Sequence, residues 1–259
     1  MEKNYTKIEK IANEGFELDF GLLFEKTFDN FKKIWGIAGV ALLLVSIVFV
    51  AFIIAIFGII YGFSDYTEKL MGLNPEFMTN TALVGFIVFS TIFAGLLSPI
   101  NAGFIKMAYL ADTNQPFGIN NVFDYFKTNH FKELFISSSI ITLVGTGIGM
   151  TIEFAGVPFL GNVLTYVVSF LTFLTIPLII FSDLKAFEAI TMSSRLVLKK
   201  PLLLLALIIV SFLFVMLGIF ALCIGIIFTI PFLFSLYYIV YKNIVPLENK
   251  DEIDEIGVF

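Results

Sequence analysis

The chain has 259 residues, of which 58% are hydrophobic and 14% are charged, and its mean hydropathy is +0.96. A soluble domain carries roughly 25% charged residues, so this composition excludes a water-soluble globular protein. The net charge of −5 arises largely from an acidic C-terminal tail and does not indicate nucleic acid as a partner.

Residues 1–19 are expected to form a cytoplasmic N-terminal segment. The first 35 residues carry six Lys and seven acidic residues before any long apolar run, which does not fit a short cleavable signal peptide. Phe24, Phe28, Phe31 and Trp35 then recur at helical spacing, with charged residues between them. This pattern predicts an amphipathic helix in the headgroup region, followed by an uncleaved first span.

Long charge-free runs predict six transmembrane helices. Residues 36–63, for example, form a run of 28 residues, which is longer than the ~30 Å hydrocarbon core requires. Residues 201–241 are also free of charge, and a single helix of 41 residues would be about twice as long as the bilayer core. This stretch must therefore reverse once. The predicted spans are about 36–63, 81–105, 134–152, 156–182, 201–217 and 221–241.

The distribution of Lys and Arg predicts the orientation of these spans. With six spans, fifteen of the sixteen basic residues fall on one side and only Lys69 falls on the other. The positive-inside rule then places both termini in the cytoplasm. Lys outnumbers Arg fifteen to one, and Phe and Ile are abundant, which is typical of an AT-rich bacterial genome. The expected location is the cytoplasmic membrane of a bacterium.

The spans fall into three similar units, each with a cytoplasmic helix before a transmembrane hairpin. In the third unit, Leu184, Phe187, Ile190 and Val197 form the apolar stripe of the expected interfacial helix. The second span of each unit contains a proline, which predicts a kink. We therefore predict an all-α polytopic fold of three repeats across residues 20–242, followed by an acidic cytoplasmic tail at 243–259. The kinks are expected at Pro99, Pro177 and Pro231.

Two cytoplasmic segments resemble those of a known group of proteins. Residues 183–202, which contain Ala189-Ile190 followed by Ser193 and Leu196, resemble a segment of bacterial multi-pass families related to the membrane domain of glycerophosphodiester phosphodiesterases. Residues 115–126, which begin Gln-Pro-Phe, are similar to the group's other recurring segment. The resemblance extends over about 20–241. It implies a membrane module of unknown activity, without the soluble phosphodiesterase domain.

The sequence contains no recognisable catalytic constellation. It has one His, His130, and one Cys, Cys223, so it can form neither a zinc motif with two His nor a disulfide. A Ser or Asp nucleophile paired with a base is also missing. We therefore predict no enzyme activity, no metal and no cofactor. The leading hypothesis is a non-catalytic membrane module that acts through membrane lipids or a membrane-protein partner.

The alternative is a passive permease or lipid-handling protein with a cavity between the proline-containing helices. Several polar residues lie close to the three prolines and could line such a cavity. They could equally satisfy broken backbone hydrogen bonds or bridge helices, which leaves both interpretations open. These residues are Ser98, Asn101, Thr175, Thr229 and Ser235.

A basic cluster precedes the fifth span. Lys185, Arg195, Lys199 and Lys200 are candidates for contact with a lipid phosphate or a partner protein. The simpler interpretation is that they form the wetted side of an interfacial helix.

Overall fold

The computed structural model of the chain describes residues 2–61, 79–220 and 225–246. These residues form helices and turns and contain no β-strand. Six helical segments are long and apolar enough to cross a membrane, so the predicted fold class is confirmed: this is an all-α, multi-pass integral membrane protein. The segments are Phe20–Ala55, Asn80–Asp112, His130–Phe154, Phe159–Ser182, Pro201–Phe220 and Gly225–Ile244.

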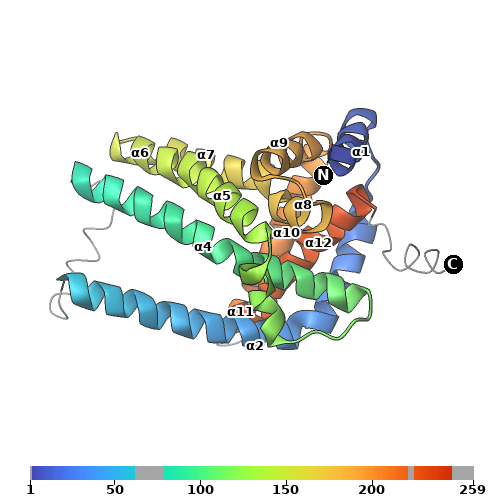
Figure 1. Ribbon diagram of the computed structural model, residues 1–259, viewed down its shortest axis with the longest axis horizontal. Helices are drawn as coiled ribbons and strands as arrows, with labels where there is room; N and C mark the ends of the chain where they lie inside the picture. The colour runs from blue at the N-terminus through green and yellow to red at the C-terminus, as the bar shows by residue number, and fades with distance from the viewer. Residues whose placement is uncertain (1, 62–78, 221–224, 247–259) are drawn as a thin grey trace.

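The basic residues gather at one end of the helix bundle, the right-hand end in Figure 1. We call it the basic end. Here α2 (Phe20–Tyr61) begins, α4 (Asn80–Asp112) ends, α5 (His130–Thr142) begins and α12 (Pro231–Ile244) ends. Every Lys and Arg among the described residues lies on the elements of this end, as the charge pattern predicted. The opposite end is called the far end.

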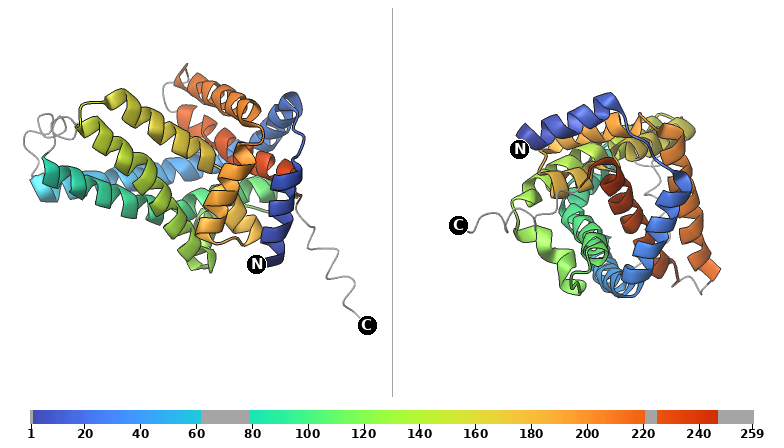
Figure 2. Two further views of the ribbon diagram at one scale, coloured as in Figure 1. Left: turned by 90° about the horizontal axis from the view of Figure 1, so that it is seen from above. Right: turned by 90° about the vertical axis from the view of Figure 1, so that its right-hand side faces the viewer.

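Helix α2 is continuous over 42 residues. Its first part crosses the basic end, and the remainder runs along the bundle (Figures 1 and 2). The predicted amphipathic helix is therefore joined to the first span without a break. Leu23, Thr27 and Ile34 are buried on its inner face, whereas Phe28 and Trp35 are exposed. The aromatic stripe thus lies partly on the outside, where it can contact lipid.

Two further elements lie at the basic end. The 3-10 helix η2 (Ile119–Lys127) contacts α4 so closely that a Cβ added to Gly103 would lie 2.4 Å from the Val122 carbonyl oxygen. Helix α9 (Ala186–Val197) follows α8 (Thr175–Ser182). Of the apolar stripe predicted for this helix, Leu184 and Val197 are buried, and Phe187 is 69% exposed, where it can contact lipid. Leu184 precedes the first helical residue, and the membrane-facing role of the stripe stays a prediction.

The face of α9 that is buried against the rest of the bundle shares only Val197 with that stripe. Its residues are Ala186, Ala189, Met192, Ser193, Leu196 and Val197.

The three prolines differ in their effect on the helices. Pro99 lies inside α4, which continues as one helix on both sides of it. Pro177 is the third residue of α8 and follows an interruption after α7 (Pro158–Thr172). Pro231 is the first residue of α12 and follows the short α11 (Gly225–Thr229). The threefold repeat itself stays a prediction.

The third and fourth spans form a tight hairpin near the far end. Helices α5 and α6 (Ile148–Phe154) are joined by the π-helical segment η3 (Leu143–Gly147). A Cβ built on Gly161 of α7 would lie 2.3 Å from the carbonyl oxygen of Gly149 on α6. Small residues thus allow the backbones of α6 and α7 to touch. The fifth span is α10 (Pro201–Met216) with the 3-10 turn η4 (Leu217–Phe220).

Helix α12 is the central helix of the bundle. It contacts α2, α4, α8 and α10, and Figure 2 (right) shows it surrounded by the other helices. In the span Gly225–Ile244, which contains α12, 50% of the most apolar stretch is buried, compared with 17% in the first span. Tyr238 and Tyr241 of α12 are among the largest fully buried side chains. The core therefore concentrates around α12 at the basic end.

The N-terminal segment contains a helix that the sequence analysis did not predict. Helix α1 (Glu2–Glu14) packs on α9 and buries Ile8 and Ala12. The Asn4 amide donates to the Ser182 carbonyl oxygen at 3.0 Å, which ties α1 to the end of α8. Residues 1–19 thus cover part of the basic end. The predicted acidic tail falls mostly at 247–259, outside the described residues.

Candidate functional site

Two of the polar residues beside the prolines donate hydrogen bonds to backbone carbonyl groups. Pro99 has no N–H, so the Gly95 carbonyl four residues earlier lacks its usual donor. The Ser98 hydroxyl donates to that oxygen at 2.8 Å. Similarly, the Thr229 hydroxyl lies 2.9 Å from the Val215 carbonyl oxygen and bridges α11 to α10. Ser98 is also buried. Both hydroxyls thus act as one of the two predicted alternatives stated: they satisfy backbone carbonyl groups or bridge helices.

Ser235 and Thr175 are also buried, but in different surroundings. The Ser235 hydroxyl donates to the Asn30 side-chain oxygen at 2.8 Å, and the Asn30 amide donates to the Ala108 carbonyl oxygen at 2.8 Å. This chain of bonds joins α12, α2 and α4. The Thr175 hydroxyl has no hydrogen-bond partner within the described part of the chain. At the interruption between α7 and α8, it is Ser193 of α9 that bonds to the backbone: its hydroxyl accepts from the Leu174 N–H and donates to the Leu171 carbonyl oxygen.

Asn101 is different, because its side chain lines a cavity of about 540 Å³. The cavity lies between α4, α5, α7, α8 and α12, inside the membrane-spanning segments. Of the five polar residues proposed for a cavity, Asn101 alone lines this one. Its wall combines nine apolar side chains with six polar ones: Asn101, Ser138, Thr142, Ser169, Thr172 and Tyr237.

Five of these six polar side chains have no hydrogen-bond partner among the described residues. Thr172 donates to the Val168 carbonyl oxygen at 2.7 Å. The other five make no side-chain hydrogen bond with any described residue. An unpaired polar group in a hydrocarbon environment costs free energy of about 1–3 kcal/mol. The five groups around this one space can therefore bond to water or to the polar part of a ligand.

The polar residues that line the cavity from the third and fourth spans were not among the predicted ones. Ser138 and Thr142 are four apart on α5, and Ser169 and Thr172 are three apart on α7. Such spacings place each pair on one helix face, which is the signal that could have found them. None of these four residues lies beside a proline of the second spans except Thr172, which is five residues before Pro177.

The basic cluster on α9 is divided in the structure. Arg195 is paired with Glu9 of α1, with 3.4 Å between the guanidinium and carboxylate groups. Lys185, Lys199 and Lys200 are exposed. Arg195 thus contacts the N-terminal helix of its own chain, whereas the three lysines remain on the surface.

The single histidine lies at the basic end and does not reach the cavity. Its Nε2 lies 2.7 Å from a carboxylate oxygen of Asp183, which ends α8 in the left-handed conformation with φ of 56°. Among the described residues, no three His, Cys, Asp or Glu side chains lie together so as to hold a metal ion.

No protein-family model, curated protein or solved structure matches this chain. The resemblance to the membrane domain of glycerophosphodiester phosphodiesterases therefore stays a prediction.

Proposed function

We propose that this chain is a non-catalytic integral membrane protein that binds a membrane lipid in the cavity between α4, α5, α7, α8 and α12. The observation that supports this proposal is the lining of the cavity, where five unpaired polar groups lie among nine apolar side chains. A lipid supplies both kinds of surface, because its glycerol and ester groups are polar and its chains are apolar.

The size and access of the cavity support a lipid ligand. Its volume of about 540 Å³ falls within the range of small-molecule sites, roughly 300–1,000 Å³. Asn101 and Ser169 are exposed on the membrane-spanning part of the bundle. A molecule can therefore enter sideways from the bilayer. The lining contains no charged side chain, which disfavours an ion as the ligand.

The experiment compares the lipids that remain bound to the full-length protein after purification in detergent. Asn101→Leu combined with Ser169→Leu should fill the cavity and remove two of its polar groups. We expect at least about a tenfold loss of specifically bound lipid in native mass spectrometry, since two hydrogen bonds and the available space are lost. Asn120→Leu, on the exposed side of η2, is the control and should retain the lipid. Equal lipid in all three proteins would contradict the proposal.

Transport through the same cavity is the alternative that the sequence left open. Purified protein in liposomes distinguishes the two functions. If solute efflux exceeds that of empty vesicles and Asn101→Leu abolishes it, the cavity is a conduit, and passive permeation replaces lipid binding as the function. If efflux matches that of empty vesicles while the lipid is retained, binding is the function.

We also infer that the basic end faces the cytoplasm of a bacterial cell, because positively charged segments resist translocation. Thiol labelling of intact cells tests this. In a Cys223→Ser background, Asn80→Cys at the far end should react with a membrane-impermeant reagent, whereas Asn13→Cys on α1 should react only after lysis. Both positions are exposed. The opposite labelling pattern would reverse the orientation.

A further inference from the structure

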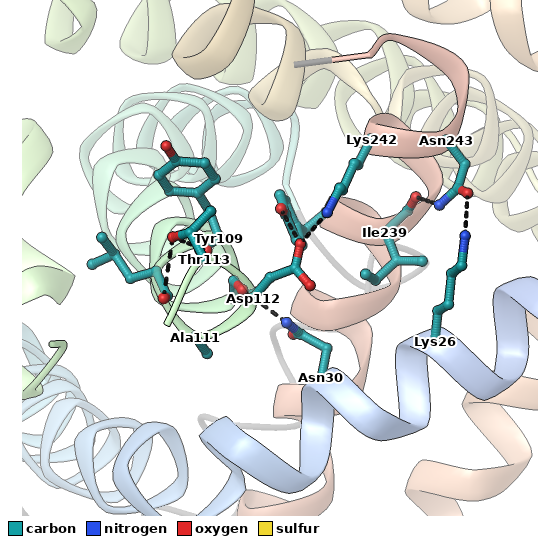
Figure 3. Close-up of polar contacts among 12 residues, drawn as sticks. Lys26, Asn30, Tyr109, Ala111, Asp112, Thr113, Ile239, Lys242 and Asn243 are labelled. Atoms are coloured by element: carbon teal, nitrogen blue, oxygen red, sulfur yellow. Dashed lines mark hydrogen bonds and ion pairs between the residues drawn. The ribbon is translucent and has the colours of Figure 1, made fainter. Parts of the chain in front are cut away.

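A second, separate cavity lies at the basic end, between α2, α4 and α12. Its volume is about 290 Å³. Figure 3 shows Lys26 reaching from α2 toward Asn243, and Lys242 reaching from α12 toward Asp112. Seven of the eight lining residues are polar or charged, in contrast to the cavity inside the bundle. They are Lys26, Asp29, Asn30, Lys33, Asp112, Lys242 and Asn243, and Ile239 completes the wall.

The charges around this cavity do not cancel. Asp112 is neutralised by Lys242 and also accepts a hydrogen bond from the Tyr238 hydroxyl at 2.7 Å. Asp29 is paired at 2.7 Å with Lys32, which is not one of the lining residues. Both carboxylates thus have a cationic partner. Lys26 and Lys33 form no direct ion pair with a carboxylate in the described part of the chain, although the charge of Lys33 also acts on Asp112.

Those two lysines contact only neutral oxygen atoms. The Lys26 ammonium donates to the Asn243 side-chain oxygen at 3.0 Å, and the Lys33 ammonium donates to the Ala111 carbonyl oxygen at 3.2 Å. An ammonium group has three N–H donors, so each lysine retains donors for a further acceptor. Two cations that border one cavity repel each other, and an anion between them removes that cost.

The backbone around the two lysines is held in place. Asn30, on the same helix between them, is only 3% exposed and links α2 to Ala108 of α4 and Ser235 of α12. Lys26 and Lys33 are seven residues apart, about two helical turns, and therefore lie on the same side of α2. The site does not require the helices to rearrange before it can bind a ligand.

We propose that this cavity binds a phosphate group through Lys26 and Lys33. A tetrahedral oxyanion offers several acceptors to two separate ammonium groups, and charge-assisted hydrogen bonds of this kind are the stronger ones. The cavity is several times the roughly 30 Å³ that a water molecule occupies in the liquid, so a phosphate group fits. The phosphate could belong to a lipid headgroup or to a molecule free in solution. The experiment separates these two sources.

The test uses full-length protein with Lys26→Gln and Lys33→Gln together. Inorganic phosphate is titrated into the detergent-solubilised protein by calorimetry. In parallel, native mass spectrometry measures phosphatidic acid that is retained from nanodiscs of phosphatidylcholine with and without phosphatidic acid. We expect the double variant to lose at least about tenfold in affinity for the probe that binds the unmodified protein. Lys127→Gln with Lys132→Gln removes the same charge elsewhere at the basic end and should not alter binding.

A charge-conserving variant guards against a folding defect. Lys26→Arg with Lys33→Arg should bind phosphate within a few-fold of the unmodified protein, because guanidinium groups also bind oxyanions. Retention of phosphatidic acid without binding of inorganic phosphate identifies a lipid headgroup, and the reverse identifies a free phosphate compound. Absence of binding to both probes, or an equal loss in the Lys127 and Lys132 control, overturns the proposal. Asn101→Leu should leave phosphate binding intact, so this site can fail independently of the cavity in the bundle.

Discussion

The basic end and the membrane interior of this protein use polar side chains in opposite ways. At the basic end, Ser235, Asn30 and the Ala108 carbonyl satisfy one another across three helices. In the interior cavity, Asn101 and Ser169 meet no partner among the described residues. Satisfied buried polar groups fix the relative positions of helices, whereas unsatisfied ones leave hydrogen-bonding capacity for another molecule. The bonded network around Asn30 therefore fixes three helices, whereas the unpaired groups of the interior cavity can bond to another molecule.

Packing shows the same difference between the two ends of α4. Close to the basic end, Gly103 leaves no room for a side chain, because η2 lies against it. Near the far end, a Cβ on Gly85 would have no neighbouring atom within 4 Å. Side chains such as Val48 and Tyr166 are 70% and 71% exposed, and lipid is their expected neighbour. One helix thus joins a closely packed region to one that borders the bilayer.

The largest expected effect comes from enlarging the two glycines of α4. Gly103→Leu should destabilise the protein by about 3 kcal/mol or more, because η2 must move away from α4. Gly85→Leu should be neutral or slightly stabilising, since Leu favours a helix more than Gly by up to about 1 kcal/mol. Thermal unfolding in detergent measures both. Equal destabilisation by the two substitutions would remove the difference in packing between the ends.

A second pair of substitutions compares the two regions through asparagine. Asn30→Ala should cost about 2–4 kcal/mol, since it leaves the Ser235 hydroxyl and the Ala108 carbonyl buried without their partner. Asn101→Ala should change the unfolding free energy by less than about 0.5 kcal/mol in detergent, because the side chain has no partner to lose. The measurement is again thermal unfolding without added lipid. A large loss for Asn101→Ala would show that the cavity is part of the structural core.

The sequence predicted the six spans because charge is excluded from the hydrocarbon region. The reversal within 201–241 followed from length alone, and the structure confirms separate spans that end at Phe220 and begin at Gly225. The clustering of basic residues at one end was predicted for the same reason, because moving a positive charge across the membrane costs free energy. These predictions depend only on whether each segment lies in lipid or in water, and the local composition of the segment indicates which.

Contacts between helices could not be predicted in this way. The hydrogen bonds of Asn30 join residues 78 and 205 positions away, and no local pattern identifies these partners. The rotation of each helix is also set by its neighbours, so Ser98 is buried whereas Asn101, three residues later, faces a cavity.

The smallest expected effect concerns the charged contact between η2 and α4. Burial raises the pKa of the Asp124 carboxyl, but hydrogen bonds from Asn121 at 2.9 Å and Lys106 at 2.7 Å outweigh this effect, so the pKa of Asp124 lies below its ordinary value. The stabilisation is therefore complete above the unfolded pKa of about 3.9 and is lost as the pH falls through the lower, folded value.

Asp124→Asn should lower the unfolding free energy by less than about 1 kcal/mol near neutral pH, because the contact is partly exposed. The difference from the unmodified protein should shrink below about pH 4 and disappear once Asp124 is protonated in the folded protein. Unfolding curves across this pH range measure it, with the exposed Glu17→Gln as the control. A difference that stays constant with pH would mean that packing of the side chain, rather than its charge, holds η2 on α4.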